Sequence, residues 1–326
     1  MKIGIGIIGC GLIGNKRARA LGSSFNLVAC YDAFKERADR LAKDHHARSC
    51  SSVSLLLCDP AIQAVVISTQ HDSLAPLTLS AVRAGKHVLV EKPAARSARE
   101  LLPVLSAAKK ARVQVRLGYN HRFHRAFRKA RKIVDGGKLG SLMMIRARYG
   151  HGGRLGYEKE WRADPKRSGG GELIDQGVHL IDLARWFLGD LKEVDGFAQT
   201  LFWKMPVDDN AFLLLRTARG QTASLHASCT EWKNLFSFEI YGRKGKLHVE
   251  GLGGSYGLEK LTWHRMLPQM GPPETKAWEF PRADDSWEVE MNEFAKDIRL
   301  RRTPKPSLKD GLEALKIVDT IYRRSQ

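Results

Sequence analysis

The sequence predicts an α/β protein with two parts: a doubly wound parallel sheet at the N-terminus, followed by an α+β domain with an open, largely antiparallel sheet. Three observations predict this fold. Apolar runs alternate with helical patterns up to about residue 120, a glycine-rich turn follows the first run, and alternating segments succeed one another after residue 190. Strands separated by helices pair in parallel, whereas successive strands pair mainly antiparallel.

The first predicted domain spans residues 1–120. Apolar runs predict strands at about residues 3–8, 27–31, 62–67, 87–90 and 113–118. Helical patterns separate these runs at about residues 12–22, 35–44, 73–84 and 97–111. This order of elements is typical of a parallel sheet with helices on both faces.

The second predicted domain spans residues 121–326. A basic helix from about residue 122 precedes a strand near 141–149 and a glycine-led helix at 170–188. Alternating segments then predict strands near 192–203, 209–217, 221–228, 235–242 and 245–250. Residues 251–283 are rich in Gly and Pro and are predicted as a loop. Two closing helices, about 285–300 and 307–324, can pack back on the first domain.

The first strand leads into the turn Gly9-Cys10-Gly11-Leu12-Ile13-Gly14. Gly9 permits the tight turn, Gly11 lets a pyrophosphate approach the backbone, and Gly14 lets the helix pack on the strand. The free N–H groups at the start of that helix would face the phosphates. This strand, turn and helix predict a dinucleotide-binding site, with Cys10 serving as a small side chain beside the cofactor.

The second strand ends in Asp32, eighteen residues beyond Gly14. A carboxylate at this place can accept hydrogen bonds from ribose hydroxyls, which favours NAD over NADP. Lys35 and Arg37 lie just beyond and could meet a 2′-phosphate, so NADP stays possible. Ser68, Thr69 and His71 follow the third predicted strand and are further candidates for cofactor binding.

Asp175 and His179 lie four residues apart in the glycine-led helix, which places them on one face. An acid and an imidazole side by side can move protons near neutral pH. Ser168 is predicted to cap this helix, and the three glycines after it leave a backbone that a ligand can approach. The alternative is a polar stripe that merely faces water.

Glu91, Lys92 and Pro93 follow the fourth strand, at the carboxyl edge of the parallel sheet where ligands of such folds bind. Lys92 is the third catalytic candidate, Glu91 and Lys92 are both assigned to the cofactor site, and Pro93 fixes the local turn. We expect the site in a cleft between the two domains.

The formal net charge is +19, and residues 101–134 contain ten Lys or Arg and no acidic residue. A nucleic-acid interface and a solvated basic face are both compatible with this pattern, and the apolar positions Phe123, Phe127 and Ile133 favour the second. The electrostatic field of this positive charge would attract anions, including phosphorylated or carboxylated sugars.

Cysteine usage and hydropathy indicate a cytoplasmic protein without a metal or membrane partner. The five cysteines are scattered, form no Cys-x-x-Cys pair and are predicted as free thiols. The histidines lack acidic or thiol neighbours at metal-ligand spacing. No apolar run approaches the roughly 20 residues that span a bilayer, and the first residues resemble a strand of the fold rather than a signal peptide.

Four motifs taken together resemble the Gfo/Idh/MocA oxidoreductase family: residues 9–14, residues 85–93, residues 118–123 and residues 169–182. The resemblance covers nearly the whole chain. It implies an NAD(P)-binding Rossmann domain, an open sheet that forms dimer or tetramer contacts, and reversible oxidation of hydroxyls on sugars or cyclitols. The family's catalytic lysine, aspartate and histidine match Lys92, Asp175 and His179. The chain departs from many members at Leu74, where they have a histidine near the cofactor.

The resulting prediction is an oxidoreductase that transfers a hydride between nicotinamide and a ring hydroxyl or ketone of a sugar, cyclitol or nucleotide-linked sugar. His179 exchanges the hydroxyl proton, Lys92 stabilises the alkoxide, and Asp175 orients the substrate or the imidazole. Candidate substrate contacts are Asn120, Arg122, Tyr157, Trp161 and Arg162. The alternatives are a non-catalytic dinucleotide sensor that binds nucleic acid through its basic surface, and a purely structural oligomeric partner.

Overall fold

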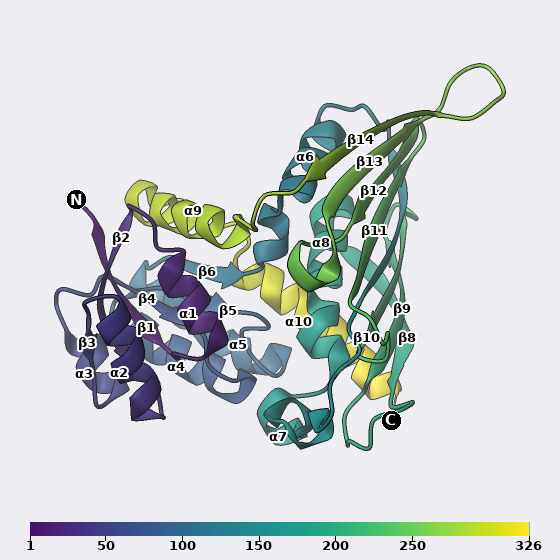
Figure 1. The fold of residues 1–326 in the computed structure, drawn as a ribbon. Coiled ribbons are helices and arrows are strands. Elements are labelled where there is room, and N and C mark those ends of the chain that lie inside the picture. Colours follow the sequence, from purple (N-terminus) through teal and green to yellow (C-terminus); the bar gives the residue numbers. More distant parts are fainter. Residues whose placement is uncertain (326) are drawn as a thin grey trace. The chain divides into compact units, whose positions relative to one another are not determined.

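The computed structural model describes residues 1–325, which divide into two units. The first unit comprises Met1–Asn120 and Trp287–Leu315. The second comprises His121–Ser286 and the chain from Lys316 to the end of the described residues. Figure 1 labels most of the helices and strands of both units.

The first unit is built on a six-stranded parallel sheet with the strand order β3-β2-β1-β4-β5-β6. Its strands are β1 (Ile3–Ile8), β2 (Phe25–Tyr31), β3 (Arg48–Ser49), β4 (Ala64–Ile67), β5 (His87–Glu91) and β6 (Val115–Gly118). The predicted doubly wound sheet is confirmed. Ile8 of β1 pairs with Tyr31 of β2 and Ile67 of β4, so these strands end at the same edge.

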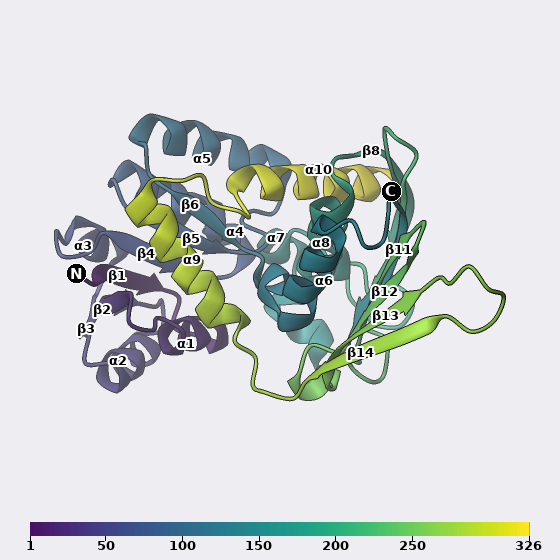
Figure 2. The same cartoon turned by 90° about the horizontal axis from the view of Figure 1, so that it is seen from above.

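Helices cover both faces of this sheet. They are α1 (Leu12–Arg19), α2 (Lys35–Asp44), α3 (Val53–Cys58), α4 (His71–Arg83), α5 (Ala98–Ala111), α9 (Ser286–Leu300) and the start of α10 (Leu308–Arg324). One core joins β1 and β2 to α1, α2 and α9, and Phe25 stacks on Phe294 with the ring centroids 5.8 Å apart. α5, with α4 beside it, lies on the opposite face (Figure 2).

The second unit contains an eight-stranded sheet with the strand order β14-β13-β12-β11-β7-β10-β9-β8. The strands are β7 (Leu142–Gly150), β8 (Leu191–Gln199), β9 (Asn210–Thr217), β10 (Thr222–Ser228), β11 (Leu235–Gly242), β12 (Gly245–Glu250), β13 (Glu259–Arg265) and β14 (Glu274–Phe280). β7 and β10 pair in parallel and all the other neighbours pair antiparallel. The predicted largely antiparallel sheet is confirmed.

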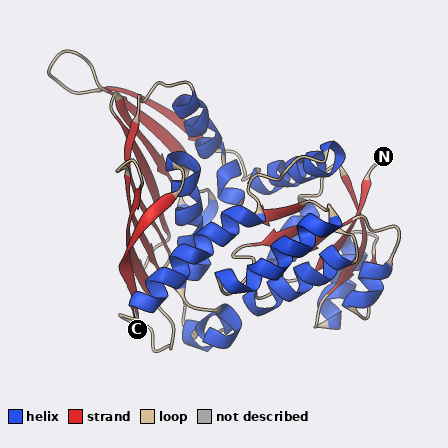
Figure 3. Cartoon of the chain, turned by 180° about the vertical axis from the view of Figure 1, so that it is seen from behind, coloured by secondary structure: helices blue, strands red, loops and turns tan. Residues whose placement is uncertain are grey.

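Two helices of the second unit pack on one face of its sheet, α6 (Arg125–Asp135) and α8 (Val178–Leu188). Phe127 of α6 and Phe238 of β11 are fully buried there, with their ring centroids 5.3 Å apart. Among the described residues no helix covers the other face (Figures 2 and 3). The short segments are η1 (Asn120–Phe123), η2 (Tyr157–Lys159), η3 (Trp161–Ala163), α7 (Pro165–Ser168), η4 (Leu173–Gly177) and η5 (Gly254–Tyr256).

The prediction of a loop over residues 251–283 is wrong, because this segment forms β13 and β14. Its glycines and prolines cluster before β13 and between the two strands, where turns require them. β14 contains no buried residue, so it lacks the alternation of apolar and polar positions that identifies a strand. Pairing with β13 along seven residues defines it instead.

Candidate active site

The residues that follow four strands of the first unit gather at one edge of its sheet. Gly9 follows β1, Asp32 follows β2, Ser68 follows β4 and Lys92 follows β5. The register aligns the ends of these strands, because Ile8 pairs with Ile67 and Ile67 pairs with Val90. The carboxyl edge of an open parallel sheet is the usual ligand-binding edge of such folds.

Each glycine of the turn has a different surrounding. Gly9 has a φ of 96°, and a Cβ added there would lie 2.6 Å from the Ser68 carbonyl oxygen. A Cβ on Gly14 would lie 2.0 Å from the Gly9 carbonyl oxygen, so the helix and strand touch through this residue. Around Gly11 no atom lies within 4 Å of an added Cβ. The open space at Gly11 fits a pyrophosphate against the bare backbone.

The N-terminus of α1 also fits an anion. Gly11 caps the helix without a side-chain hydrogen bond, and the first turn contains no acidic residue. Asn15 Nδ2 donates to the carbonyl oxygens of Cys10 and Gly11, both at 2.9 Å, and so holds the turn from inside. Sequence reasoning missed Asn15, because an amide one residue beyond the last glycine is unremarkable until the turn closes over it.

Asp32 links the glycine turn to the segment after β2. One carboxylate oxygen accepts a hydrogen bond from the Cys10 N–H at 2.7 Å, and the other accepts from the Phe34 N–H at 2.9 Å. The two cations that could meet a 2′-phosphate are engaged locally: Lys35 pairs with Asp39 at 2.6 Å, and the Arg37 guanidinium lies over the Phe34 ring. These contacts favour NAD.

The other predicted cofactor contacts surround this turn. Ser68 Oγ donates to the Gly9 carbonyl oxygen at 2.8 Å, and Thr69 Oγ1 donates to the Gln70 carbonyl oxygen at 3.4 Å. His71 begins α4 and is buried. A hydrogen bond with Cys30 and burial raise the pKa of the Cys10 thiol, which leaves it a neutral side chain rather than a nucleophile.

Lys92 sits in a tight turn at the end of β5. The Ala94 N–H donates to the Glu91 carbonyl oxygen at 3.0 Å, and Ala94 adopts a φ of 72°, which is uncommon for a residue other than glycine. Glu91, Pro93 and Ala94 are buried, whereas Lys92 is only partly buried. The Glu91 carboxylate forms an ion pair with Arg17 at 2.5 Å.

In the second unit, the start of the helix is capped by Asp208 and not by the predicted cap Ser168, whose Oγ accepts from the Gly170 N–H at 3.2 Å. The N–H groups of Gly171 and Leu173 each donate to the Asp208 carboxylate at 2.8 Å, and the Tyr322 hydroxyl donates to it at 2.8 Å. Burial raises the pKa of Asp208 to about 6. Ser168 instead ends the short helix α7.

Two of the three glycines make room for protein atoms rather than for a ligand. A Cβ on Gly171 would lie 1.8 Å from the Asp208 carbonyl oxygen, and one on Gly170 would lie 2.1 Å from the Tyr322 hydroxyl oxygen. The predicted role of these glycines in ligand approach is therefore wrong for both. No pattern in the sequence links residue 171 to residues 208 and 322, which lie far along the chain.

Asp175 and His179 are both buried, so the alternative of a stripe facing water is wrong. The predicted continuous α-helix is also interrupted, since residues Leu173–Gly177 are π-helical and α8 begins at Val178. A π-turn inside a helix is frequently found at functional sites. Arg162 Nε donates to an Asp175 oxygen at 2.8 Å, and Asp175 raises the pKa of Arg162.

The imidazole of His179 stacks on the ring of His121, with the centroids 3.8 Å apart. A second acid, Glu172, lies at the start of the same helix. It is 1 % exposed and accepts a hydrogen bond from the Tyr157 hydroxyl at 3.0 Å. His151 Nε2 lies 3.1 Å from the same Glu172 oxygen. Burial works to lower the pKa of His151, but Glu172 raises it above its ordinary value. Sequence reasoning missed Glu172 and His121.

The remaining predicted substrate contacts differ in their surroundings. The Arg122 guanidinium forms a buried pair of hydrogen bonds with Asp182, at 2.8 and 2.6 Å. The Arg162 guanidinium lies over the Trp161 ring, 4.6 Å from its centroid. Asn120 is buried at the start of η1.

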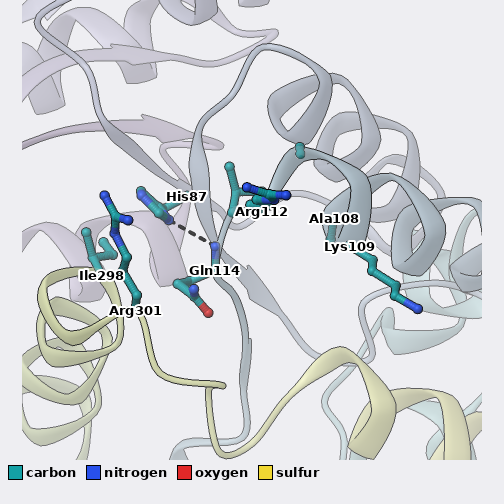
Figure 4. Close-up of a pocket in the computed structure, with 9 residues that line it drawn as sticks. His87, Ala108, Lys109, Arg112, Gln114, Ile298 and Arg301 are labelled. Carbon is teal, nitrogen blue, oxygen red and sulfur yellow. Dashed lines mark hydrogen bonds between the residues drawn. The ribbon is translucent and has the colours of Figure 1, made fainter.

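A depression of about 650 Å³ lies elsewhere on the first unit. His87 and Gln114, from the strand starts, line it together with Lys109, Arg112 and Arg301 (Figure 4). The Gln114 N–H donates to His87 Nδ1 at 2.9 Å. His87 begins β5 and Lys92 follows its end, so this basic depression and the candidate cofactor site lie at opposite edges of the sheet.

All five cysteines are free thiols. Within residues 1–325, no group of three or more His, Cys, Asp or Glu side chains is arranged to hold a metal ion. No helix in the same range is long and apolar enough to cross a membrane.

A fold and a site of this kind define a class of dinucleotide-dependent oxidoreductases, and comparison with known proteins gives the family. The oxidoreductase family model with an NAD-binding Rossmann fold matches residues 3–119, and the GFO/IDH/MocA C-terminal domain model matches residues 127–248. The chain belongs to the Gfo/Idh/MocA family of oxidoreductases. The predicted family, enzyme class and NAD cofactor are confirmed.

Individual relatives agree with this assignment. Inositol 2-dehydrogenase of Rhizobium meliloti is 28% identical, covering 99% of this chain and 97% of the relative. The 1,5-anhydro-D-fructose reductase of Ensifer adhaerens is 31% identical, covering 74% of each chain. The structure of levoglucosan dehydrogenase in complex with NADH is similar in fold, with a TM-score of 0.89, 23% identity, and coverage of 98% of this chain and 96% of that one.

Proposed function

We propose that this chain catalyses NAD-dependent hydride transfer between nicotinamide and a ring hydroxyl or ketone of a sugar or cyclitol. The observation that carries the proposal is the sheet edge at which Gly11, Asp32 and Lys92 lie, together with the buried Asp175 and His179 of the second unit. Relatives named for inositol, levoglucosan and anhydrofructose support the substrate class.

Bound nicotinamide supplies the hydride acceptor, and the residues of this chain handle the proton. In the direction of oxidation, His179 accepts the hydroxyl proton of the substrate, and its stacking on His121 restricts the orientation of the imidazole. Lys92 stabilises the developing alkoxide with its ammonium. Asp175, oriented by Arg162, positions the substrate or the His179 ring.

The first unit binds the cofactor in this proposal. The backbone from Gly9 to Gly14 holds the pyrophosphate, and Asp32 accepts from the ribose hydroxyls. Ser68, Thr69 and His71 border the turn, and Glu91 contributes by orienting Lys92.

The second unit binds the sugar. Tyr157, Trp161 and Arg162 form the substrate segment, and Asn120, the last residue of the first unit before the second begins, is a further candidate contact. Arg122 stays a further candidate contact, because its two hydrogen bonds to Asp182 fix the guanidinium and use only two of its five N–H donors. The net charge of +19 favours a substrate that carries phosphate or carboxylate.

The test is a panel of free, phosphorylated and nucleotide-linked sugars and cyclitols with NAD or NADP, followed by absorbance of the reduced nicotinamide. The Lys92→Ala and His179→Ala variants should lose about 10³-fold in kcat and still bind NADH. Lys110→Ala removes an exposed lysine and serves as the control. Absent turnover across the panel, with salt-sensitive binding to DNA, would instead support the non-catalytic sensor.

We also propose a cytoplasmic homo-oligomer. Free thiols are typical of a reducing compartment. The uncovered face of the eight-stranded sheet carries apolar side chains among polar ones, including Phe197 and Leu214, which are 49% and 55% exposed. The Phe197 and Phe212 rings lie side by side across β8 and β9, with the centroids 5.4 Å apart and the planes tilted by 38°. Light scattering of the wild type beside Leu214→Glu tests whether this face joins two copies.

A further inference from the structure

A buried ion-pair cluster of the first unit contains Glu91, the residue before Lys92. Arg17 of α1 is fully buried, and its Nη2 lies 2.5 Å from Glu91 Oε1 while its Nη1 lies 2.6 Å from Glu290 Oε2. Arg17 Nε donates to the same Glu91 oxygen at 2.6 Å. The guanidinium also lies over the Trp287 ring, 4.5 Å from the centroid. One arginine therefore joins α1, the end of β5 and α9.

The cluster is tightly enclosed. A Cβ on Gly118, at the end of β6, would lie 2.8 Å from Arg17 Nη2 and 3.1 Å from Glu91 Oε2. Glu290 is fully buried, and burial raises its pKa while Arg17 opposes that shift. An uncompensated charge in such a place is strongly unfavourable, so each member of the cluster holds the others in position.

The cluster supports the turn from Glu91 to Ala94, which has a strained backbone conformation. Glu91 is the residue before Lys92, and its carbonyl oxygen closes the turn by accepting from the Ala94 N–H. Ala94 is fully buried and has a φ of 72°, a conformation that is unfavourable for a side chain with a Cβ. Residues kept in such conformations persist where the surrounding structure fixes them, and they are frequent at active sites.

We propose that Arg17 and Glu290 are positioning residues for Lys92: they fix the Glu91 carboxylate and thereby the turn that presents the lysine. The inference rests on the proposed function, in which Lys92 acts on the substrate hydroxyl. It also gives a role to residues 287–315, which belong to the first unit but lie outside both family matches. Through Glu290, this returning segment completes the support of the site.

The structure offers a matched control on the same helix. Asp297 of α9 is fully buried, like Glu290, and pairs with a buried arginine, Arg116, at 2.6 Å. The comparison is Glu290→Gln with Asp297→Asn, because each replaces one buried carboxylate of α9 by an amide of the same shape. Both variants should lower the melting temperature. Only Glu290→Gln should lower kcat, by about 10–100-fold, with KM and the Kd for NADH changed less than about threefold.

A second measurement observes Lys92 without relying on turnover. Lysines are reductively methylated with ¹³C-formaldehyde, and the Lys92 resonance is identified by its loss in Lys92→Arg. In Glu290→Gln this resonance should move toward the position of exposed lysines, whereas in Asp297→Asn it should stay in place. Arg17→Lys keeps the charge without the forked geometry and should give an intermediate shift, which provides a second variant if Glu290→Gln does not fold.

The outcomes separate this inference from the proposed function. If Glu290→Gln and Asp297→Asn lose stability alike while kcat and the Lys92 resonance match the wild type, the cluster is only structural and the inference is wrong. If Lys92→Ala retains wild-type turnover, the proposed function is wrong, and the resonance alone then decides whether Arg17 and Glu290 position the lysine.

Discussion

At the scale of single residues, the glycine turn separates groups that shape the fold from groups that leave room for a ligand. Gly9 and Gly14 are surrounded by protein atoms, whereas Gly11 faces open space. Gly11 also has a φ of −73°, which any residue can adopt. A side chain at this position would therefore be harmless to the unliganded protein and would collide only with the cofactor.

This distinction predicts opposite effects for two substitutions. Gly11→Val should leave the melting temperature of the unliganded protein unchanged within about 2 °C and should abolish NADH binding. Gly14→Ala should lower the melting temperature itself, because its Cβ would lie 2.0 Å from the Gly9 carbonyl oxygen. Thermal melts with and without NADH measure both. Normal NADH binding by Gly11→Val would contradict the proposal that the pyrophosphate binds at Gly11.

Asp32 allows a test of cofactor choice. Asp32→Ala removes the acceptor for the ribose hydroxyls and for two backbone N–H groups, so the Kd for NAD should rise by about 10–100-fold. Affinity for NADP should fall less, because its 2′-phosphate is repelled by this carboxylate. Asp44→Ala, which removes an exposed carboxylate at the end of α2, is the control for charge. Fluorescence titration with each cofactor measures the two Kd values. An equal loss of affinity for NAD and NADP would contradict the assignment of Asp32 to the ribose hydroxyls.

Among the helices and strands, the local sequence pattern was sufficient to predict an element wherever that element packs an apolar face of its own. α2 spans Lys35–Asp44, as the charge and apolar periodicity predict, and β11 and β12 lie where alternation places them. β3 and α3 were missed because two and six residues are too short to show a period.

The candidate site was predictable where it follows the ends of strands and unpredictable where it depends on contacts between distant residues. Gly9, Asp32 and Lys92 each follow an apolar run, so the sequence places them at one edge. Asp208 and Glu290 could not be found this way, because nothing near them in the sequence shows that they support the glycine-led segment and the Lys92 turn.

Asp208 also predicts a pH dependence of stability. Its pKa is raised from 3.8 to about 6, so the folded protein holds this proton more tightly than the unfolded chain. The associated contribution, about 3 kcal/mol, is fully present below pH 3.8 and is lost as pH rises through about 6. Asp208→Asn should remove this component. Urea unfolding from pH 4 to 7 measures it.

The quantity to compare is the difference in the free energy of unfolding between the wild type and Asp208→Asn. Other carboxylates titrate in both proteins, so their contributions cancel in this difference. The free energy of unfolding of the wild type relative to the variant should decrease as pH rises through this window. A difference that is flat, or that increases with pH, would contradict the raised pKa of Asp208.

At the scale of the whole molecule, the net charge of +19 should act on association with substrate. A positive field raises the encounter rate of anions, and salt screens it within about 8 Å at physiological ionic strength. For a phosphorylated sugar, kcat/KM should fall about tenfold between low and high salt, while a neutral sugar should change little. Steady-state kinetics at a series of salt concentrations measures this, and equal salt dependence would contradict the preference for an anionic substrate.

In the proposed reaction, this chain moves a hydride from a ring carbon to nicotinamide, and Lys92 and His179 act on the hydroxyl. The most direct measurement uses a substrate from the panel that carries deuterium on its ring carbons, with mass spectrometry of the NADH formed. We expect one deuterium per NADH in the wild type, and NADH formation about 10³-fold slower in Lys92→Ala and His179→Ala. NADH without deuterium, or undiminished rates in both variants, would contradict it.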